Sequence, residues 1–290
     1  MTRTRLGLIG LITIVSVALT FPATAAAWPQ AQGQAQAPAA SASPPTAQSQ
    51  PEKPDPTLVL RIGDPRLKDK TMSVGLGTIM AAGTGRAVAF ERMIQDMRAS
   101  RFVYVGETHN SLPMHEIQFQ ILRALYAQDR HLAIGLEMLP VTVQETLDKW
   151  SAGLLTEEEL IRGVRWYVNW NFNFGFYAKL FDFAKEHRLP VYALNVPREI
   201  ITKVRMRGWD ALSDEEKMFI PKSPDLTNKD HRTLIRTIFE SSDIPPQMKG
   251  AGLDMMFEGL YRGQSAWDEV MSANAVRGAE SEGRRVVVCA

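Results

Sequence analysis

Four short apolar segments set the strongest limit on how this chain can fold. None of them alternates apolar with polar residues: RFVYV (101–105), HLAIGLEM (131–138), PVYALNV (190–196) and RRVVVCA (284–290). A strand with one solvated face alternates, whereas a parallel strand covered by helices on both faces is apolar along its length. We therefore predict an α/β fold with a mostly parallel central sheet flanked by helices.

The segments between these strands have helical patterns. Pro113 is suited to the first turn of a helix, and Thr156 and Glu159 have the spacing of a capping box. A further short strand is expected over 57–62, ahead of the helices. Helices are predicted over 90–100, 113–128, 156–164 and 176–187, from Pro197 onward, and through most of 210–282, a helical insertion before the last strand.

The N-terminus has the layout of a secretory signal peptide. Arg3 and Arg5 precede an apolar run, and small residues in A-x-A spacing follow it. We predict a signal peptide over 1–27 and a periplasmic or secreted protein; the alternative is a retained anchor, since roughly 20 apolar residues span a bilayer. The cleavage region has no cysteine to carry a lipid, because the chain's one cysteine is Cys289. That count also excludes an internal disulfide.

The composition changes sharply after the apolar run. Residues 28–57 are rich in Pro, Ala, Gln and Ser, and such a segment is expected to be a disordered tether. The α/β domain is predicted over 58–290, with 45% hydrophobic and 22% charged residues in the whole chain. The net charge is +1 and the basic residues are spread out, so nothing indicates a nucleic-acid partner.

Polar residues follow the predicted strands at the points where the strands end. Glu107 and His109 follow the first strand, Glu137 ends the second, and Arg198 comes shortly after the third. The carboxyl ends of parallel strands meet at one edge of a sheet, where ligands bind. With His115, these residues form a candidate site at that edge.

Two functional interpretations of this cluster remain open. Imidazole and carboxylate groups hold divalent metals, so Glu107, His109, His115 and Glu137 are candidate metal ligands. Alternatively, Glu107 or Glu137 orients His109, which then acts as a general base. The purely structural interpretation is that Glu107 caps the start of the next helix and that His115 is a partly exposed helix residue.

An aromatic segment, WYVNWNFNFGFY (166–177), offers a different kind of site. Its seven rings in twelve positions could line a pocket for a flat apolar ligand such as a porphyrin, or they could pack in the core. Tyr167 and Tyr177 are candidate ligands in the first case, because phenolates bind ferric iron.

These motifs together resemble the ChaN-like haem-binding uptake family, in the superfamily of TIKI metalloproteases and erythromycin esterases. The resemblance covers roughly 86–290 and lies in FVYVGETHNSLPMHEIQFQILRAL, AIGLEML, FYAKLFDFAKEHRLPVYALNVPREI and YRGQSAWDEVMSANAV. It implies a bacterial exported protein of haem or iron uptake. It further implies haem held at a homodimer interface, with tyrosine on the iron and polar groups on the propionates. On this chain, the resemblance points to Tyr177 for the iron, with Arg198, His109 and His115 as further haem-binding residues.

The wider superfamily uses the G-E-x-H motif, a second glutamate and a later G-x-x-H motif as a catalytic or metal site. The first two match Glu107, His109 and Glu137, with His115 following, while the later motif would lie after RRVVVCA. We therefore expect that this sequence is truncated at its C-terminus.

Three functions follow as hypotheses. The first is an exported protein that binds haem, or another small flat ligand, in iron uptake, with a place at the outer membrane or cell surface left open. The second is a metal-dependent or His/Glu-based hydrolase. The third is a tethered interaction module.

Overall fold

The computed structural model describes residues 57–61, 69–81, 84–241 and 251–290. The predicted signal peptide lies outside the described residues, and so does the predicted tether apart from Thr57. The described residues divide into two compact units, one ending at Val88 and one starting at Ala89.

The first unit consists of short antiparallel strands. β1 (Thr57–Arg61) pairs with β2 (Thr71–Gly75), and β3 (Ile79–Ala81) pairs with β4 (Arg86–Val88). The strand predicted over 57–62 is therefore present.

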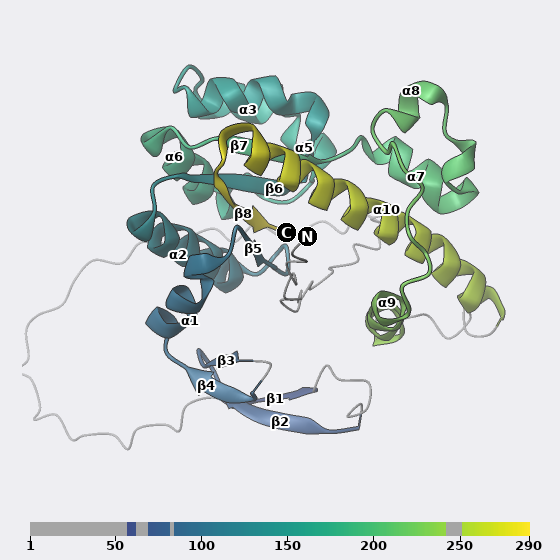
Figure 1. The fold of residues 1–290 in the computed structure, drawn as a ribbon, viewed down its shortest axis with the longest axis horizontal. Helices are drawn as coiled ribbons and strands as arrows, with labels where there is room; N and C mark the ends of the chain where they lie inside the picture. Colours follow the sequence, from purple (N-terminus) through teal and green to yellow (C-terminus); the bar gives the residue numbers. More distant parts are fainter. Residues whose placement is uncertain (1–56, 62–68, 82–83, 242–250) are drawn as a thin grey trace, which may run out of the picture. The chain divides into compact units, whose positions relative to one another are not determined.

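A four-stranded sheet forms the centre of the second unit (Figure 1). Its order is β5 (Phe102–Val105), β8 (Arg285–Cys289), β6 (Leu132–Pro140) and β7 (Val191–Asn195), and all neighbours are parallel. The predicted α/β class is confirmed. The last strand of the chain lies inside the sheet, between β5 and β6, which the apolar pattern alone did not indicate.

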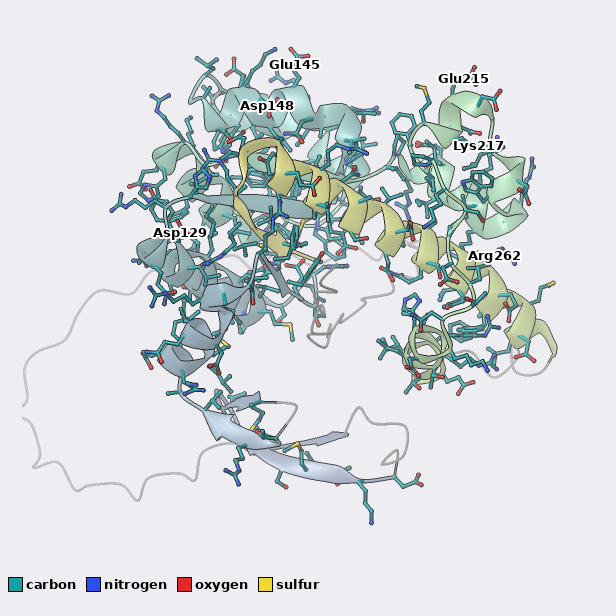
Figure 2. The ribbon with its side chains drawn as sticks, in the orientation of Figure 1. Asp129, Glu145, Asp148, Glu215, Lys217 and Arg262 are labelled. Carbon is teal, nitrogen blue, oxygen red and sulfur yellow. The ribbon has the colours of Figure 1, made fainter. Side chains whose placement is uncertain are left out.

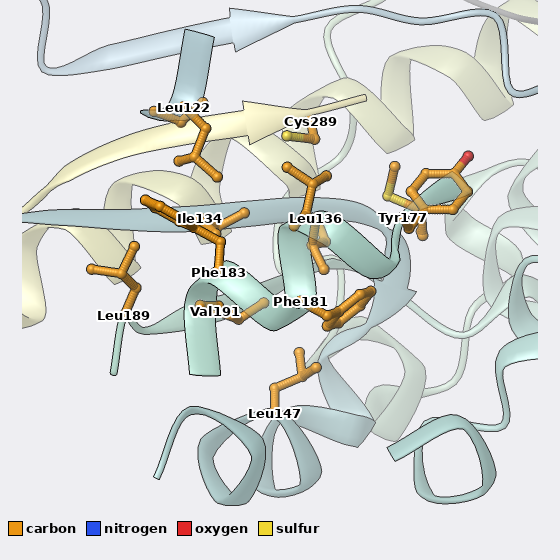
Figure 3. Close-up of a cluster of buried hydrophobic side chains, with 14 of the residues drawn as sticks. Leu122, Ile134, Leu136, Leu147, Tyr177, Phe181, Phe183, Leu189, Val191 and Cys289 are labelled. Atoms are coloured by element: carbon orange, nitrogen blue, oxygen red, sulfur yellow. The ribbon is translucent and has the colours of Figure 1, made fainter. Parts of the chain in front are cut away.

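The strands are apolar throughout because both faces of the sheet are buried. In β8, Val287 and Cys289 belong to the larger core cluster, while Val286 and Val288 pack on the other face. In β6, Ile134 likewise faces the larger cluster and Ala133 the smaller one. Figure 3 shows the larger cluster, in which Leu122, Ile134, Leu136 and Cys289 lie close together.

Helices cover the two faces of this sheet. The bounds of the helices around β5 and β6 are α1 (Phe90–Asp96), η2 (Met97–Ala99), α2 (Leu112–Gln128), η3 (Val141–Val143), α3 (Gln144–Ser151) and α4 (Glu157–Gly163). Those that follow are α5 (Trp166–Asn169), η4 (Phe174–Phe176), α6 (Ala178–His187), α7 (Arg198–Arg207), η5 (Trp209–Ala211), α8 (Asp214–Lys217), α9 (Lys229–Ser241) and α10 (Ala251–Glu282). Residues of α2, α3 and α6 line the larger cluster, whereas Ala275 and Ala279 of α10 line the smaller one.

Most of the predicted helices are present with bounds shifted by a few residues. Thr156 accepts a hydrogen bond from the Glu159 amide and Glu159 accepts one from the Thr156 amide, so the predicted capping box of α4 is confirmed. Pro113 lies in the first turn of α2, as expected. The region 210–282 contains η5, α8, α9 and α10, and is mostly helical.

The long helix α10 approaches the sheet closely. A Cβ atom on Gly278 would lie 2.5 Å from Cδ2 of Tyr192 in β7, so a side chain there would displace the ring. Within the described ranges, no helix combines the length and the apolar character that crossing a membrane requires.

Replacing Gly278 by alanine should therefore destabilise the second unit. We expect Gly278→Ala to lower the free energy of unfolding by about 1–3 kcal/mol, the usual cost of overpacking. Gly252→Ala is the matched control on the same helix, because nothing lies within 4 Å of its Cβ position. Urea unfolding should find the control unchanged or slightly stabilised; equal effects of the two variants would contradict the close contact.

Candidate functional site

The loop after β5 and the start of α2 bring three polar side chains together. Glu107 and His109 follow β5, and His115 lies in the first two turns of α2. All three side chains are buried, and Glu107 is 0% exposed. A carboxylate without solvent is costly unless hydrogen bonds and opposite charges surround it.

Glu107 is the centre of this cluster. Its Oε1 accepts a hydrogen bond of 2.5 Å from the Tyr177 hydroxyl and lies 3.1 Å from His109 Nδ1. Its Oε2 lies 3.0 Å from His115 Nδ1. Three side chains from separate parts of the chain therefore converge on one carboxyl group.

Hydrogen-bond geometry fixes the direction of most of these bonds. The Tyr177 hydroxyl accepts from Trp170 Nε1, 2.8 Å away, so its own hydrogen is directed to Glu107. His115 Nε2 lies 3.1 Å from the His109 carbonyl oxygen and must donate to it.

His109 is held in one orientation and keeps one nitrogen available. Its Nδ1 donates to Glu107, which leaves a lone pair on Nε2 when the ring is neutral. Among the described residues, Nε2 has no hydrogen-bond partner. Rings of Trp170 and Phe172 lie 4.4 and 4.9 Å from the His109 ring, centroid to centroid. The arrangement can support either a general base or a metal ligand.

Tyr177 connects the network to the hydrophobic core. Its ring is buried at the edge of the core, and Figure 3 shows its hydroxyl pointing away from the aliphatic side chains. Burial and then the Glu107 carboxylate raise the pKa of Tyr177 above that of an ordinary phenol. The predicted role as an iron ligand needs the phenolate, which this environment disfavours, and it stays a prediction.

Glu137 occupies an irregular part of β6. The β6–β7 register shifts between Leu136 and Pro140, and Asn195 Nδ2 donates to the Glu137 carbonyl oxygen at 3.0 Å. Bulges of this kind redirect side chains beside sites. Burial raises the pKa of Glu137 to about 7; the His109 ring opposes this shift, and the Glu107 and Asp268 carboxylates add to it. Glu137 therefore shares the electrostatic environment of the network, and its predicted catalytic and metal-binding roles stay predictions.

Arg198 lies apart from the hydrogen-bonded network. It begins α7 after Pro197 and is exposed, and no ion pair of its side chain is found in the described part of the chain. Its predicted role with a ligand carboxylate is compatible with this exposure and stays a prediction.

The structure gives limited support to the predicted metal site. Within residues 57–61, 69–81, 84–241 and 251–290, no group of three His, Cys, Asp or Glu side chains is arranged to hold an ion. Glu107, His109 and His115 instead bond to one another, which leaves His109 Nε2 as the ligand atom of this set that remains available. The chemistry of an imidazole backed by a carboxylate fits a metal, and the four-ligand set stays a prediction.

The sequence did not reveal several residues that support the site. Trp170 bonds to Tyr177 and contacts His109, and Phe176 stacks on His115 at 5.4 Å. Both lie in the aromatic segment, which was the only signal available. Asp268 of α10 is the third such residue, because its carboxylate adds to the raised pKa of Glu137. It accepts a hydrogen bond from Gln264 and pairs with His231 at 2.8 Å.

The second unit thus combines a parallel α/β sheet with a buried Glu–His pair at its carboxyl edge. The family model described as "Haem-binding uptake, Tiki superfamily, ChaN" matches residues 93–290. The chain belongs to this family.

The chain is also similar to a solved structure and to a plant protein. The solved structure titled "Cofacial heme binding to ChaN of Campylobacter jejuni" has a TM-score of 0.57 and 17% identity, and the match covers 73% of this chain and 78% of that one. At this identity the likeness concerns the fold. The Arabidopsis thaliana protein RETICULATA-RELATED 5, chloroplastic, is 26% identical over 155 residues, which is 50% of this chain and 20% of that protein. The chain thus matches about a fifth of the length of that relative.

The pKa of Glu137 predicts a pH-dependent stability. Glu137 gives up its proton at a higher pH in the folded chain than in the unfolded chain. Its contribution to the unfolding free energy is therefore fully present below pH 4.5 and is lost as the pH rises through about 7. Replacing Glu137 by glutamine removes this loss. Between pH 5 and pH 8, we expect the variant to gain about 2 kcal/mol in unfolding free energy relative to the unmodified chain.

Urea unfolding at the two pH values measures this difference. Glu145→Gln, on the solvent side of α3, is the matched control, because Glu145 pairs with Lys149 in the open and should show no gain. A Glu137→Gln difference that is the same at both pH values would show that Glu137 ionises normally.

Proposed function

We propose that this chain is an exported haem-binding protein that serves haem or iron uptake. Family membership supports haem as the ligand. The observation that carries the proposal in this chain is an exposed tyrosine in the aromatic segment, whose Trp170 and Tyr177 contact the buried Glu107 network. Export rests on the signal-like N-terminus, and a homodimer with haem at its interface stays a prediction from the family resemblance.

The exposed tyrosine is Tyr167, on α5. Trp166, Phe174 and Tyr177 of the aromatic segment are buried in the core, whereas Tyr167 is 55% exposed. Tyr167 is three residues before Trp170, which directly follows the last residue of α5. Trp170 in turn contacts His109. We therefore assign Tyr167 as the phenol that would hold the iron, with Tyr177 behind it as a support.

The surroundings supply the other contacts that haem requires. Exposed apolar side chains precede the network residues in the chain: Leu112 and Met114 come before His115, and Val168 comes before Trp170. They could cover the faces of a porphyrin, which bind by apolar contact. Arg198 is the exposed cation at the end of β7 and fits a propionate. When bound, haem would supply the iron that the phenolate holds.

A hemin titration of the full chain tests this assignment. We expect saturable binding with a shift of the Soret band, and at least tenfold weaker binding for Tyr167→Phe, about 1.4 kcal/mol. Tyr126→Phe is the matched control, because Tyr126 packs on Phe183 and His187 away from the network. Absence of saturable binding would overturn haem binding as the function. Equal binding by the Tyr126→Phe control and Tyr167→Phe would overturn only the assignment of Tyr167 as the iron ligand.

A hydrolase is the second candidate, and one observation favours it. Glu107 fixes the His109 ring so that Nε2 is a free base, and Glu137, with its pKa of about 7, can hold a proton in the same environment. Such a pair can remove a proton from water and return one to a leaving group. The substrate would be an ester or peptide, as the superfamily resemblance implies.

Activity on model esters and peptides, with and without added divalent metal, tests this candidate. We expect His109→Ala and Glu107→Gln each to lower kcat by at least a hundredfold, the usual contribution of general base catalysis. Glu116→Gln, whose carboxylate pairs with Lys179 at the surface of α2, should keep full activity. Failure to detect turnover of any of these substrates, with or without metal, would leave haem binding as the function.

A further inference from the structure

A cavity lies at the opposite edge of the sheet from the Glu107 network. Its volume is about 230 Å³, and its polar lining comes from Ser100, Arg101, Asp129, His131, Arg284 and Arg285. These residues directly precede or begin β5, β6 and β8, whose amino ends meet because the strands are parallel. Asp129, just before β6, is labelled in Figure 2.

The main chain holds the three segments of the cavity together. The Arg285 amide donates to the His131 carbonyl oxygen at 3.2 Å, and the Val286 amide donates to the Arg101 carbonyl oxygen at 3.0 Å. Gly283 has a φ of 68°, a conformation that suits glycine and that turns the chain from α10 into β8. The His131 ring bonds to the Glu282 carbonyl oxygen at 3.0 Å. The cavity is therefore a fixed feature of the sheet edge.

The charges that line the cavity are mostly positive and only partly neutralised. Three arginines face one lining carboxylate, Asp129, whose Oδ1 already accepts from the His131 amide. Arg284 pairs with Glu282. Among the described residues, the Arg101 side chain makes no ion pair; it lies over the Phe102 ring.

Arg285 supplies the most specific observation. Its Nη2 donates to the Arg98 carbonyl oxygen, while its Nη1 is buried and lacks a hydrogen-bond partner among the described residues. A buried donor without a partner is costly, and a bound acceptor would remove that cost. The helix ends near this edge also present carbonyl groups, which attract cations. One of these, the Arg98 carbonyl, already accepts from Arg285 Nη2, so it does not engage Nη1.

We propose that this cavity binds a small oxyanion, a phosphate or the phosphate group of a small phosphomonoester. Guanidinium groups bind phosphate oxygens with paired, charge-assisted hydrogen bonds. The exposed Arg101 guanidinium is the donor that such an ion meets first, with Ser100 as a neutral neighbour, and Arg285 Nη1 becomes a second donor when its side chain turns toward the ion. The volume is below that of ordinary pockets for drug-sized ligands, and it suits a phosphate with a small organic group better than a porphyrin. The site is thus separate from the proposed haem site.

Calorimetric titration of the full chain with inorganic phosphate tests the proposal. We expect saturable binding in the millimolar range or tighter, competition by sulfate, and no competition by chloride. Arg101→Gln and Arg285→Gln should each weaken binding by at least tenfold. Arg162→Gln is the control, because Arg162 pairs with Glu158 on the exposed side of α4 and should bind phosphate normally.

The two cavity variants protect the test against a folding defect. Arg285 also bonds to the Arg98 carbonyl, so its replacement could disturb the local fold. Within the described ranges, the Arg101 side chain makes no hydrogen bond, and its variant should unfold like the unmodified chain. No saturable phosphate binding, or equal binding by Arg101→Gln and Arg162→Gln, would overturn the proposal. Hemin binding by both variants should be unchanged, which separates this site from the proposed function.

Discussion

The buried carboxyl group of Glu107 is the interaction on which the site depends. A carboxylate removed from water must be surrounded by polar groups, and here these groups come from the loop after β5, from α2 and from the segment that leads into α6. Two of these side chains are fixed by further bonds: Trp170 Nε1 donates to the Tyr177 hydroxyl, and His115 Nε2 bonds to the His109 carbonyl oxygen. The result is a rigid unit in which the position of one histidine follows from the position of one glutamate.

This constraint explains why the aromatic segment has two roles. Its buried members, Trp166, Phe174 and Tyr177, complete the core against which the network rests. Its exposed member, Tyr167, lies on a helix too short to be stable alone, which Trp166 anchors to the core. A ligand that binds Tyr167 would therefore meet a surface whose underlying side chains are already fixed. Such preorganisation reduces the entropy that a bound ligand would cost.

The fold could be predicted from the sequence because its signals are local. Apolar runs identified four parallel strands, and the Thr156–Glu159 pair identified a helix start to the residue. The central position of β8 could not be predicted, because strand order depends on long-range packing that no short pattern records. For the site, the rule for strand ends brought Glu107, His109 and Glu137 into one environment. The bond from Tyr177 to Glu107 joins residues 70 positions apart and had no signal in the sequence.

The hydrogen position on His109 tests the central claim most directly. Nitrogen-15 NMR of histidine-labelled protein above neutral pH distinguishes the two neutral tautomers. We predict a hydrogen on Nδ1, bonded to Glu107, and none on Nε2, with Tyr177→Phe making the two forms more equal. A hydrogen on Nε2 of the unmodified protein would contradict the account, because Glu107 would then not orient the ring, and the free Nε2 lone pair that the hydrolase candidate requires would be absent.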